Sequence, residues 1–147
     1  NFPTTEMRYL KVFVMNQHTG TSNANAGFTF NLTKKPISFN STGNFVGANI
    51  TAPSTISKMG AVITYTETGT NTLNTDIIMQ LSSDGGSNFT TATLTPLPDF
   101  ATGIKMAKVN DLSLTGGTGT SLTYKISFAN QSDGSKVANI KGVSLQY

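Results

Sequence analysis

The chain of 147 residues contains no cysteine and no tryptophan, and His18 is its only histidine. The absence of cysteine excludes disulfide bonds and thiolate metal sites, so stability must come from the core or from partner subunits. A metal site built on several histidines is excluded as well, because only one is present. His18 lies in a polar segment with no partner residue nearby in sequence, which disfavours a catalytic imidazole.

Charged residues are also scarce, at 12% of the chain, and glutamate occurs only as Glu6 and Glu67. A helical protein would carry far more Glu, Lys, Ala and Leu, whereas the abundant Thr, Ser, Asn and Gly of this chain are typical of strands and turns. The formal net charge of +3 comes from cations spread thinly along the sequence. Since a nucleic-acid-binding protein concentrates its cations in a patch, we expect no nucleic-acid partner.

Long hydrophobic runs are missing too. No stretch of about 18 apolar residues occurs, so we expect no membrane span. The chain begins with Asn1-Phe2-Pro3 and carries no signal-peptide pattern, so we expect it to follow a segment that was removed by maturation or is missing from a partial sequence. The length is that of one domain, and we expect a single domain over residues 1–147.

The segment Ser82–Phe89 is a polar turn centred on two glycines, between the strand-like runs 77–81 and 90–95. It predicts a β-hairpin whose loop reaches positive φ. Its spacing of Ser, Asp, Gly and a terminal aromatic resembles the Asp-box of sialidases and related β-proteins, with phenylalanine where that motif usually has tryptophan. The resemblance implies a folding element in which the carboxylate bonds the backbone of its own turn. We therefore assign a structural role in the turn to five residues: Ser82, Asp84, Gly85, Gly86 and Phe89.

Alternation of apolar and polar residues predicts further strands. The strictest alternation lies between Ser121 and Phe128, and it places Lys125 on the outward face of the predicted strand. In the last strand, over residues 137–147, the apolar residues change from even-numbered to odd-numbered positions. This change predicts a β-bulge at Lys141-Gly142. The inward residues predicted to share one core layer are Leu122, Tyr124, Ile126 and Phe128.

Residues 37–57 are the least regular part, and we predict one short edge strand near Phe45 to Ile50. Pro96 and Pro98 predict a connector rather than a strand. About eight or nine short strands separated by turn signals indicate an all-β fold, and we predict an antiparallel β-sandwich of jelly-roll type.

The run Arg8–Asn16 is apolar on both faces of the strand that it predicts. If one face lies on the core, the other must be covered by a neighbouring strand or by a partner subunit, because soluble monomers avoid such an exposed row. We therefore treat residues 1–57 as an assembly arm or edge region. The residues of the candidate interface are Tyr9, Phe13 and Met15.

The seven carboxylates could include a glycosidase pair, since that chemistry needs only two acids at a defined separation. Asp84 and Asp133 precede glycines in turns, however, where a carboxylate is usually tied to nearby backbone amides. We therefore expect no enzyme, no catalytic residue, no metal and no cofactor. An Asp-box glycosidase is a remote alternative, and calcium held by dispersed ligands is another, since no Asp-x-Asp-x-Asp loop occurs. The carboxylates considered for calcium are Asp76, Asp99 and Asp111.

The second half of the chain carries a series of short motifs in a fixed order. They are Asn74-Thr75-Asp76, Ser82-Ser83-Asp84-Gly85-Gly86, Gly103-Ile104-Lys105, residues 119–126, Asn130-Gln131 and residues 140–145. In their order and spacing they are similar to a domain from the C-terminal regions of structural and appendage proteins of tailed phages, particularly marine and cyanobacterial ones. That family often ends in tryptophan, where this chain ends in Tyr147.

This resemblance implies a non-enzymatic structural component of a phage virion, located on the extracellular particle as a decoration, fibre or appendage protein. Its partners would be other virion proteins, with a homo-oligomer expected. The alternative is a carbohydrate- or receptor-binding module of a tail fibre that recognises a host-surface glycan. Polar loops rich in Asn, Thr and Gly favour this alternative, whereas the absence of tryptophan, the preferred sugar-stacking residue, weakens it.

Overall fold

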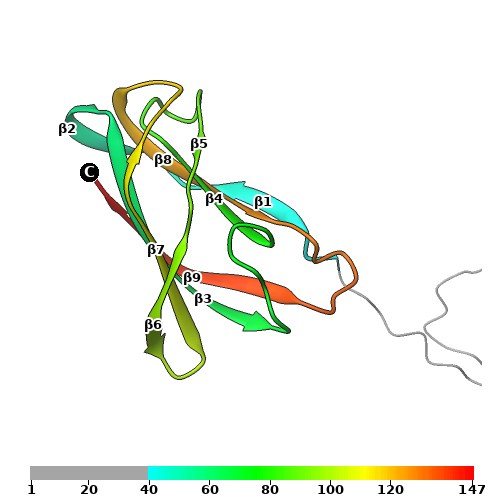
Figure 1. Cartoon of the computed structure of the whole chain (residues 1–147). Helices are drawn as coiled ribbons and strands as arrows, with labels where there is room; N and C mark the ends of the chain where they lie inside the picture. Colours follow the sequence, from blue (N-terminus) through cyan, green and yellow to red (C-terminus); the bar gives the residue numbers. More distant parts are fainter. Residues whose placement is uncertain (1–39) are drawn as a thin grey trace, which may run out of the picture. The chain divides into compact units, whose positions relative to one another are not determined.

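The computed structural model describes residues 40–147, which form the strands and turns of Figure 1. The run Arg8–Asn16 and the candidate interface residues Tyr9, Phe13 and Met15 lie outside the described residues.

The described residues form nine strands and no helix, so the predicted all-β class is confirmed. No helix in residues 40–147 therefore offers the length and apolar character needed to cross a membrane. The strands are β1 (Gly43–Val46), β2 (Ile50–Ile56), β3 (Lys58–Thr68), β4 (Ile77–Ser82), β5 (Thr90–Thr91), β6 (Thr95–Ala101), β7 (Ile104–Ser113), β8 (Gly119–Phe128) and β9 (Val137–Gln146).

The strands form two antiparallel sheets. One sheet has the order β1-β8-β4-β5, with β2 also paired to β8, and the other has the order β6-β7-β3-β9. The apolar faces of both sheets contribute to one hydrophobic core. The predicted antiparallel β-sandwich is thus confirmed, while its jelly-roll type stays a prediction. The unit from Pro36 to Tyr147 contains all nine strands, and the single domain over residues 1–147 also stays a prediction.

The core follows from the period-two alternation of the central strands. On β8, Leu122 and Ile126 are fully buried, and Tyr124 and Phe128 are half-buried and pack against the core, so the predicted layer is confirmed. The facing sheet contributes the alternate residues of β3. The buried hydrophobic residues of β3 are Met59, Ala61, Ile63 and Tyr65.

The β-bulge predicted in the last strand is present. Thr64 pairs with Gly142 and Tyr65 pairs with Ile140, so Lys141 has no partner on β3. Because of this extra residue, the apolar side chains of both halves of β9 point into the core.

The predicted edge strand is also present, but it is broken in two. β1 pairs with one half of β8 and β2 with the other, and Gly47 between them donates its backbone N–H to the carbonyl of Tyr124 at 2.8 Å. A Cβ on Gly47 would lie 2.3 Å from the Tyr124 ring, so glycine lets this ring lie against the edge backbone. The hydroxyl of Thr123 donates to the Gly47 carbonyl at 2.7 Å and fixes the break.

Two predictions about residues 90–101 were wrong. The predicted second strand of the hairpin pairs with β4 only at Thr90–Thr91, after which the chain crosses to the other sheet. Pro96 and Pro98 lie within β6 rather than in a connector. Proline is tolerated there because β6 is an edge strand, whose outward N–H groups have no ladder partner to lose.

The connection between the sheets determines which edges face each other. Only residues 92–94 separate β5 from β6, so these two edge strands bound the same side of the sandwich. The opposite side is therefore bounded by β1 and β2 on one sheet and by β9 on the other.

Candidate functional site

The turn after β4 is held by the side chain of Asp84. Its Oδ1 accepts hydrogen bonds from the Ser82 hydroxyl at 2.7 Å and from the Asn88 backbone N–H at 2.9 Å. Its Oδ2 accepts one from the Asn88 amide at 2.7 Å. These donors, the backbone of Asn88 first, lower the pKa of Asp84 to about 2. The carboxylate is thus occupied by its own turn, as the Asp-box resemblance implies.

Both glycines of this turn adopt a positive φ. Gly85 has φ 74° and Gly86 has φ 89°, a region that residues with a Cβ rarely adopt. A Cβ on Gly86 would also lie 3.3 Å from the Phe89 ring. The Ser82 hydroxyl accepts a hydrogen bond from the Gly86 N–H at 3.0 Å, which closes the turn.

The turn pairs with the start of β8 through its backbone and contacts the outer face of β8 through Phe89. The Gly85 N–H donates to the Ser121 carbonyl at 2.8 Å, and the Ser121 N–H donates to the Ser83 carbonyl at 3.0 Å. The ammonium of Lys125 lies 5.8 Å from the centre of the Phe89 ring, within the range of a cation–π contact. Lys125 therefore has the outward parity predicted for it, yet it is half-buried by the turn.

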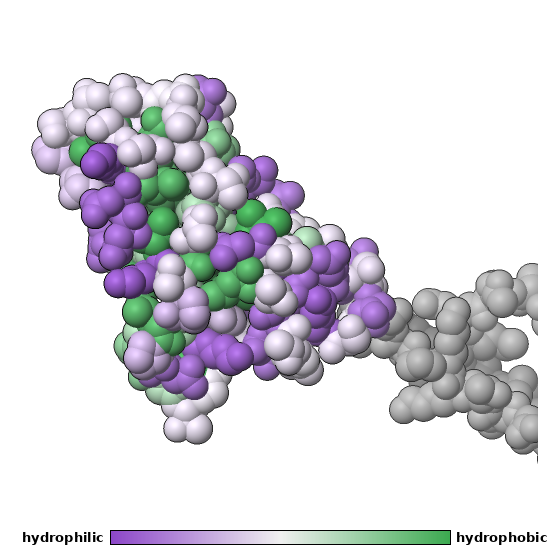
Figure 2. Space-filling view, in the orientation of Figure 1, coloured by the Kyte–Doolittle hydropathy of each residue, from purple (hydrophilic) through white to green (hydrophobic). Residues whose placement is uncertain are grey.

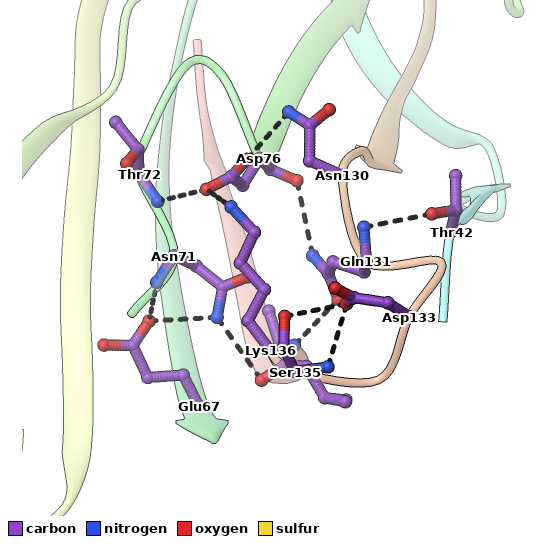
Figure 3. Close-up of polar contacts among 12 residues, drawn as sticks. Thr42, Glu67, Asn71, Thr72, Asp76, Asn130, Gln131, Asp133, Ser135 and Lys136 are labelled. Atoms are coloured by element: carbon purple, nitrogen blue, oxygen red, sulfur yellow. Dashed lines mark hydrogen bonds and ion pairs between the residues drawn. The ribbon is translucent and has the colours of Figure 1, made fainter. Parts of the chain in front are cut away.

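A second polar cluster lies at the start of β4 (Figure 3). Oδ2 of Asp76 accepts hydrogen bonds from the Thr72 N–H at 2.8 Å and from the Lys136 ammonium at 2.6 Å. Oδ1 accepts one from the Asn130 amide at 2.9 Å. The Asp76 side chain is only 2% exposed, and its donors, Lys136 first, lower its pKa to about 2.

Gln131 joins this cluster to the backbone of Asp76 and Ala138 and to the side chain of Thr42. Its amide donates to the Asp76 carbonyl at 3.4 Å, and its side-chain oxygen accepts from the Ala138 N–H at 3.0 Å. Its own N–H donates to the Thr42 hydroxyl at 3.1 Å. The cluster brings together two motifs of the phage-protein resemblance, residues 74–76 and 130–131. Lys136 was not singled out in the sequence, because nothing local marks a lysine that pairs with a carboxylate sixty residues away.

Of the four other carboxylates in residues 40–147, two accept hydrogen bonds from neighbouring side chains or backbone and two are exposed. Glu67 accepts two hydrogen bonds from Asn71 and pairs with Lys105, and Asp133 accepts two from Ser135. Asp99 on β6 and Asp111 on β7 are exposed. Residues 40–147 contain no cluster of three His, Cys, Asp or Glu side chains that could hold a metal ion, so the dispersed calcium ligands do not converge.

The side of the sandwich at β1 and β2 exposes apolar side chains. Phe45 is 38% exposed, Val46 53% and Ile50 49%. The Phe45 ring lies 6.1 Å from both the Tyr124 and the Phe128 ring, so the apolar row continues inward to the core. Figure 2 shows hydrophobic residues reaching the surface along the middle of one face of the molecule, between polar margins.

Comparisons of the chain with protein-family models, with curated proteins and with solved structures found no match.

Proposed function

We propose that this chain is a non-enzymatic structural component of a phage virion that acts through protein–protein assembly. The motifs of the second half support the virion assignment by resemblance. The observation that carries the assembly role is the edge formed by β1 and the start of β2, where Phe45, Val46 and Ile50 are exposed. Exposed edge strands with apolar side chains readily pair with another chain.

The other edges of the described sheets carry features that discourage such pairing. β6 contains two prolines, β9 is interrupted by the bulge at Lys141, and β5 has only two residues. Proline, bulges and short strands are the usual means by which proteins protect a sheet edge. β1 has no proline and no bulge in its four residues, whereas β2 contains Pro53 and an irregular register between Thr51 and Ile56, so the edge open to pairing is β1 and the start of β2.

The backbone of β1 is also oriented for strand addition. Gly47 donates to β8, and hydrogen-bonding direction alternates along an antiparallel strand, so the N–H groups of Asn44 and Val46 point away from β8. A strand laid along this edge would gain these hydrogen bonds. It would cover Phe45 and Ile50, which pair with core residues of β8, on one face and Val46, which pairs with Lys125, on the other. We assign this edge to contact with another copy of the chain in a virion oligomer.

Sedimentation velocity of the full chain over a range of concentrations tests the proposal. We expect a concentration-dependent oligomer that Val46→Lys weakens by about tenfold or more in dissociation constant, because the lysine is placed in an apolar contact. Val46→Pro should have a similar effect, since it removes a donor that points away from β8. The control is Thr55→Lys, an equal charge change at an exposed position of β2.

Thermal unfolding followed by circular dichroism must show that each variant remains folded. A wild-type chain that stays monomeric at millimolar concentration contradicts the proposal. Equal weakening by Thr55→Lys would also contradict it, because the effect would then come from net charge and not from this edge.

A further inference from the structure

A β-bulge in β7 places a strained residue on the outer face of the second sheet. Met59 pairs with Leu112 and Ala61 pairs with Val109, so Gly60 alone lies opposite both Asn110 and Asp111. Asp111 has φ 50°, a left-handed conformation that is uncommon for a residue with a Cβ. Bulges and strained residues of this kind cluster at binding sites, where they redirect a side chain.

The bulge borders a hollow in the outer surface of the sheet. A Cβ on Gly60 would lie 2.9 Å from the Val109 carbonyl and 3.1 Å from Oε1 of Gln146, so glycine lets β7 and β9 approach closely at this position. The hollow has a volume of about 570 Å³, with Gly60 and Val62 among its lining residues. Its other lining residues include Lys58, Lys108, Asn110, Asp111, Gln146 and Tyr147.

A second hollow of about 450 Å³ lies beside the first and shares Lys108, Asn110 and Asp111 with it. It is lined in addition by Thr93, Thr95 and Ser113, which carry hydroxyl groups. Both hollows are wide and open to solvent, which fits a ligand that lies along the surface and not one enclosed in a pocket. The two hollows meet at the bulge, so one elongated ligand could contact both.

The polar side chains at this groove differ from those of the two clusters described above. Glu67, Asp76, Asp84 and Asp133 are all bonded within the protein. By contrast, the side chains of Lys58, Lys108 and Asp111 form no hydrogen bond and no ion pair with residues 40–147; the two ion pairs in that range are Lys105–Glu67 and Lys136–Asp76. Within residues 40–147 the bonding capacity of these three side chains is unused.

We propose that this groove binds an acidic oligosaccharide. The exposed ring of Tyr147, 62% accessible, offers an apolar face for a sugar ring. The amides of Asn110 and Gln146 and the carboxylate of Asp111 match sugar hydroxyls, which both donate and accept. The ammonium groups of Lys58 and Lys108 match the carboxylates of an acidic sugar. The Asp111 carboxylate favours a sugar, whose hydroxyls can donate hydrogen bonds to it, over a nucleic-acid backbone, whose phosphates offer no donor. This inference does not depend on the assembly proposal, because the groove and the β1 edge belong to different sheets.

Isothermal titration calorimetry of the full chain provides the test. The probes are tetragalacturonate, a hyaluronan tetrasaccharide and sialyllactose, with maltotetraose as the neutral control. We expect saturable binding of at least one acidic probe, weakened by salt, and much weaker binding of maltotetraose. Lys108→Gln should weaken binding about tenfold or more, whereas Lys141→Gln, the same charge change at an exposed position of β9, should leave it unchanged.

Asp111→Gly provides a variant whose loss of binding cannot come from unfolding. Glycine adopts the φ of this position without strain, so the melting temperature should be maintained or raised while binding falls. Absence of saturable binding to all three acidic probes overturns the inference. So does equal weakening by Lys108→Gln and Lys141→Gln, equal affinity for maltotetraose, or tighter binding of a single-stranded oligonucleotide that depends on Lys108.

Discussion

Replacement of Ile126 by alanine tests the sandwich core directly. Ile126 lies in the middle of β8, is fully buried, and pairs with Phe45 on one side and Met79 on the other. Truncation of a buried isoleucine to alanine removes apolar contacts and leaves a cavity, at a cost of about 2–5 kcal/mol. Two features affect where in this range the value falls. The position is on a central strand, which raises the cost, while the flexible Met79 side chain can fill part of the cavity, which lowers it.

We therefore expect Ile126→Ala to lower the free energy of unfolding by about 3–4 kcal/mol. For a domain of this size the melting temperature should fall by about 10–20 °C. Urea unfolding followed by circular dichroism measures the change. The control is Ser127→Ala, on the opposite face of the same strand, which should change the free energy by less than about 0.5 kcal/mol. Equal effects at the two positions would refute the assignment of the two faces of β8.

Two further predictions concern the polar clusters at the two ends of β4. Asp84→Asn should lower the melting temperature at pH 7. Because the pKa of Asp84 falls from 3.8 to about 2 on folding, its contribution is present above pH 4 and is lost as the pH falls towards 2, so the deficit of the variant should shrink over that window in a pH series of thermal melts. Lys136→Met should also lower the melting temperature, because it leaves the buried carboxylate of Asp76 without its cation. Asp76 has the same lowered pKa, of about 2, so this deficit too should be largest above pH 4; a deficit independent of pH would show that Lys136 acts through packing alone.

The parts of the fold that were predicted correctly are those encoded by local periodicity. The layer of Leu122 and Ile126 followed from alternation along one strand, because successive side chains of a strand point to opposite faces. The bulge at Lys141 followed from a change of parity within one strand. The internal bonding of Asp84 followed from short spacings within a turn, where the donors lie within four residues of the carboxylate. Signals of this kind need no knowledge of which strands are neighbours.

Tertiary structure alone decided the features that depend on strand order. Pro96 and Pro98 could belong to a strand because β6 is the outermost strand of its sheet, which no local pattern specifies. Asp76 and Lys136 are in contact because the loop before β4 and the loop before β9 come together in the fold, although the two residues lie sixty positions apart. The groove at Asp111 exists because Gly60 on β3 faces two residues of β7, a register that is set by the packing of both sheets and not by either strand.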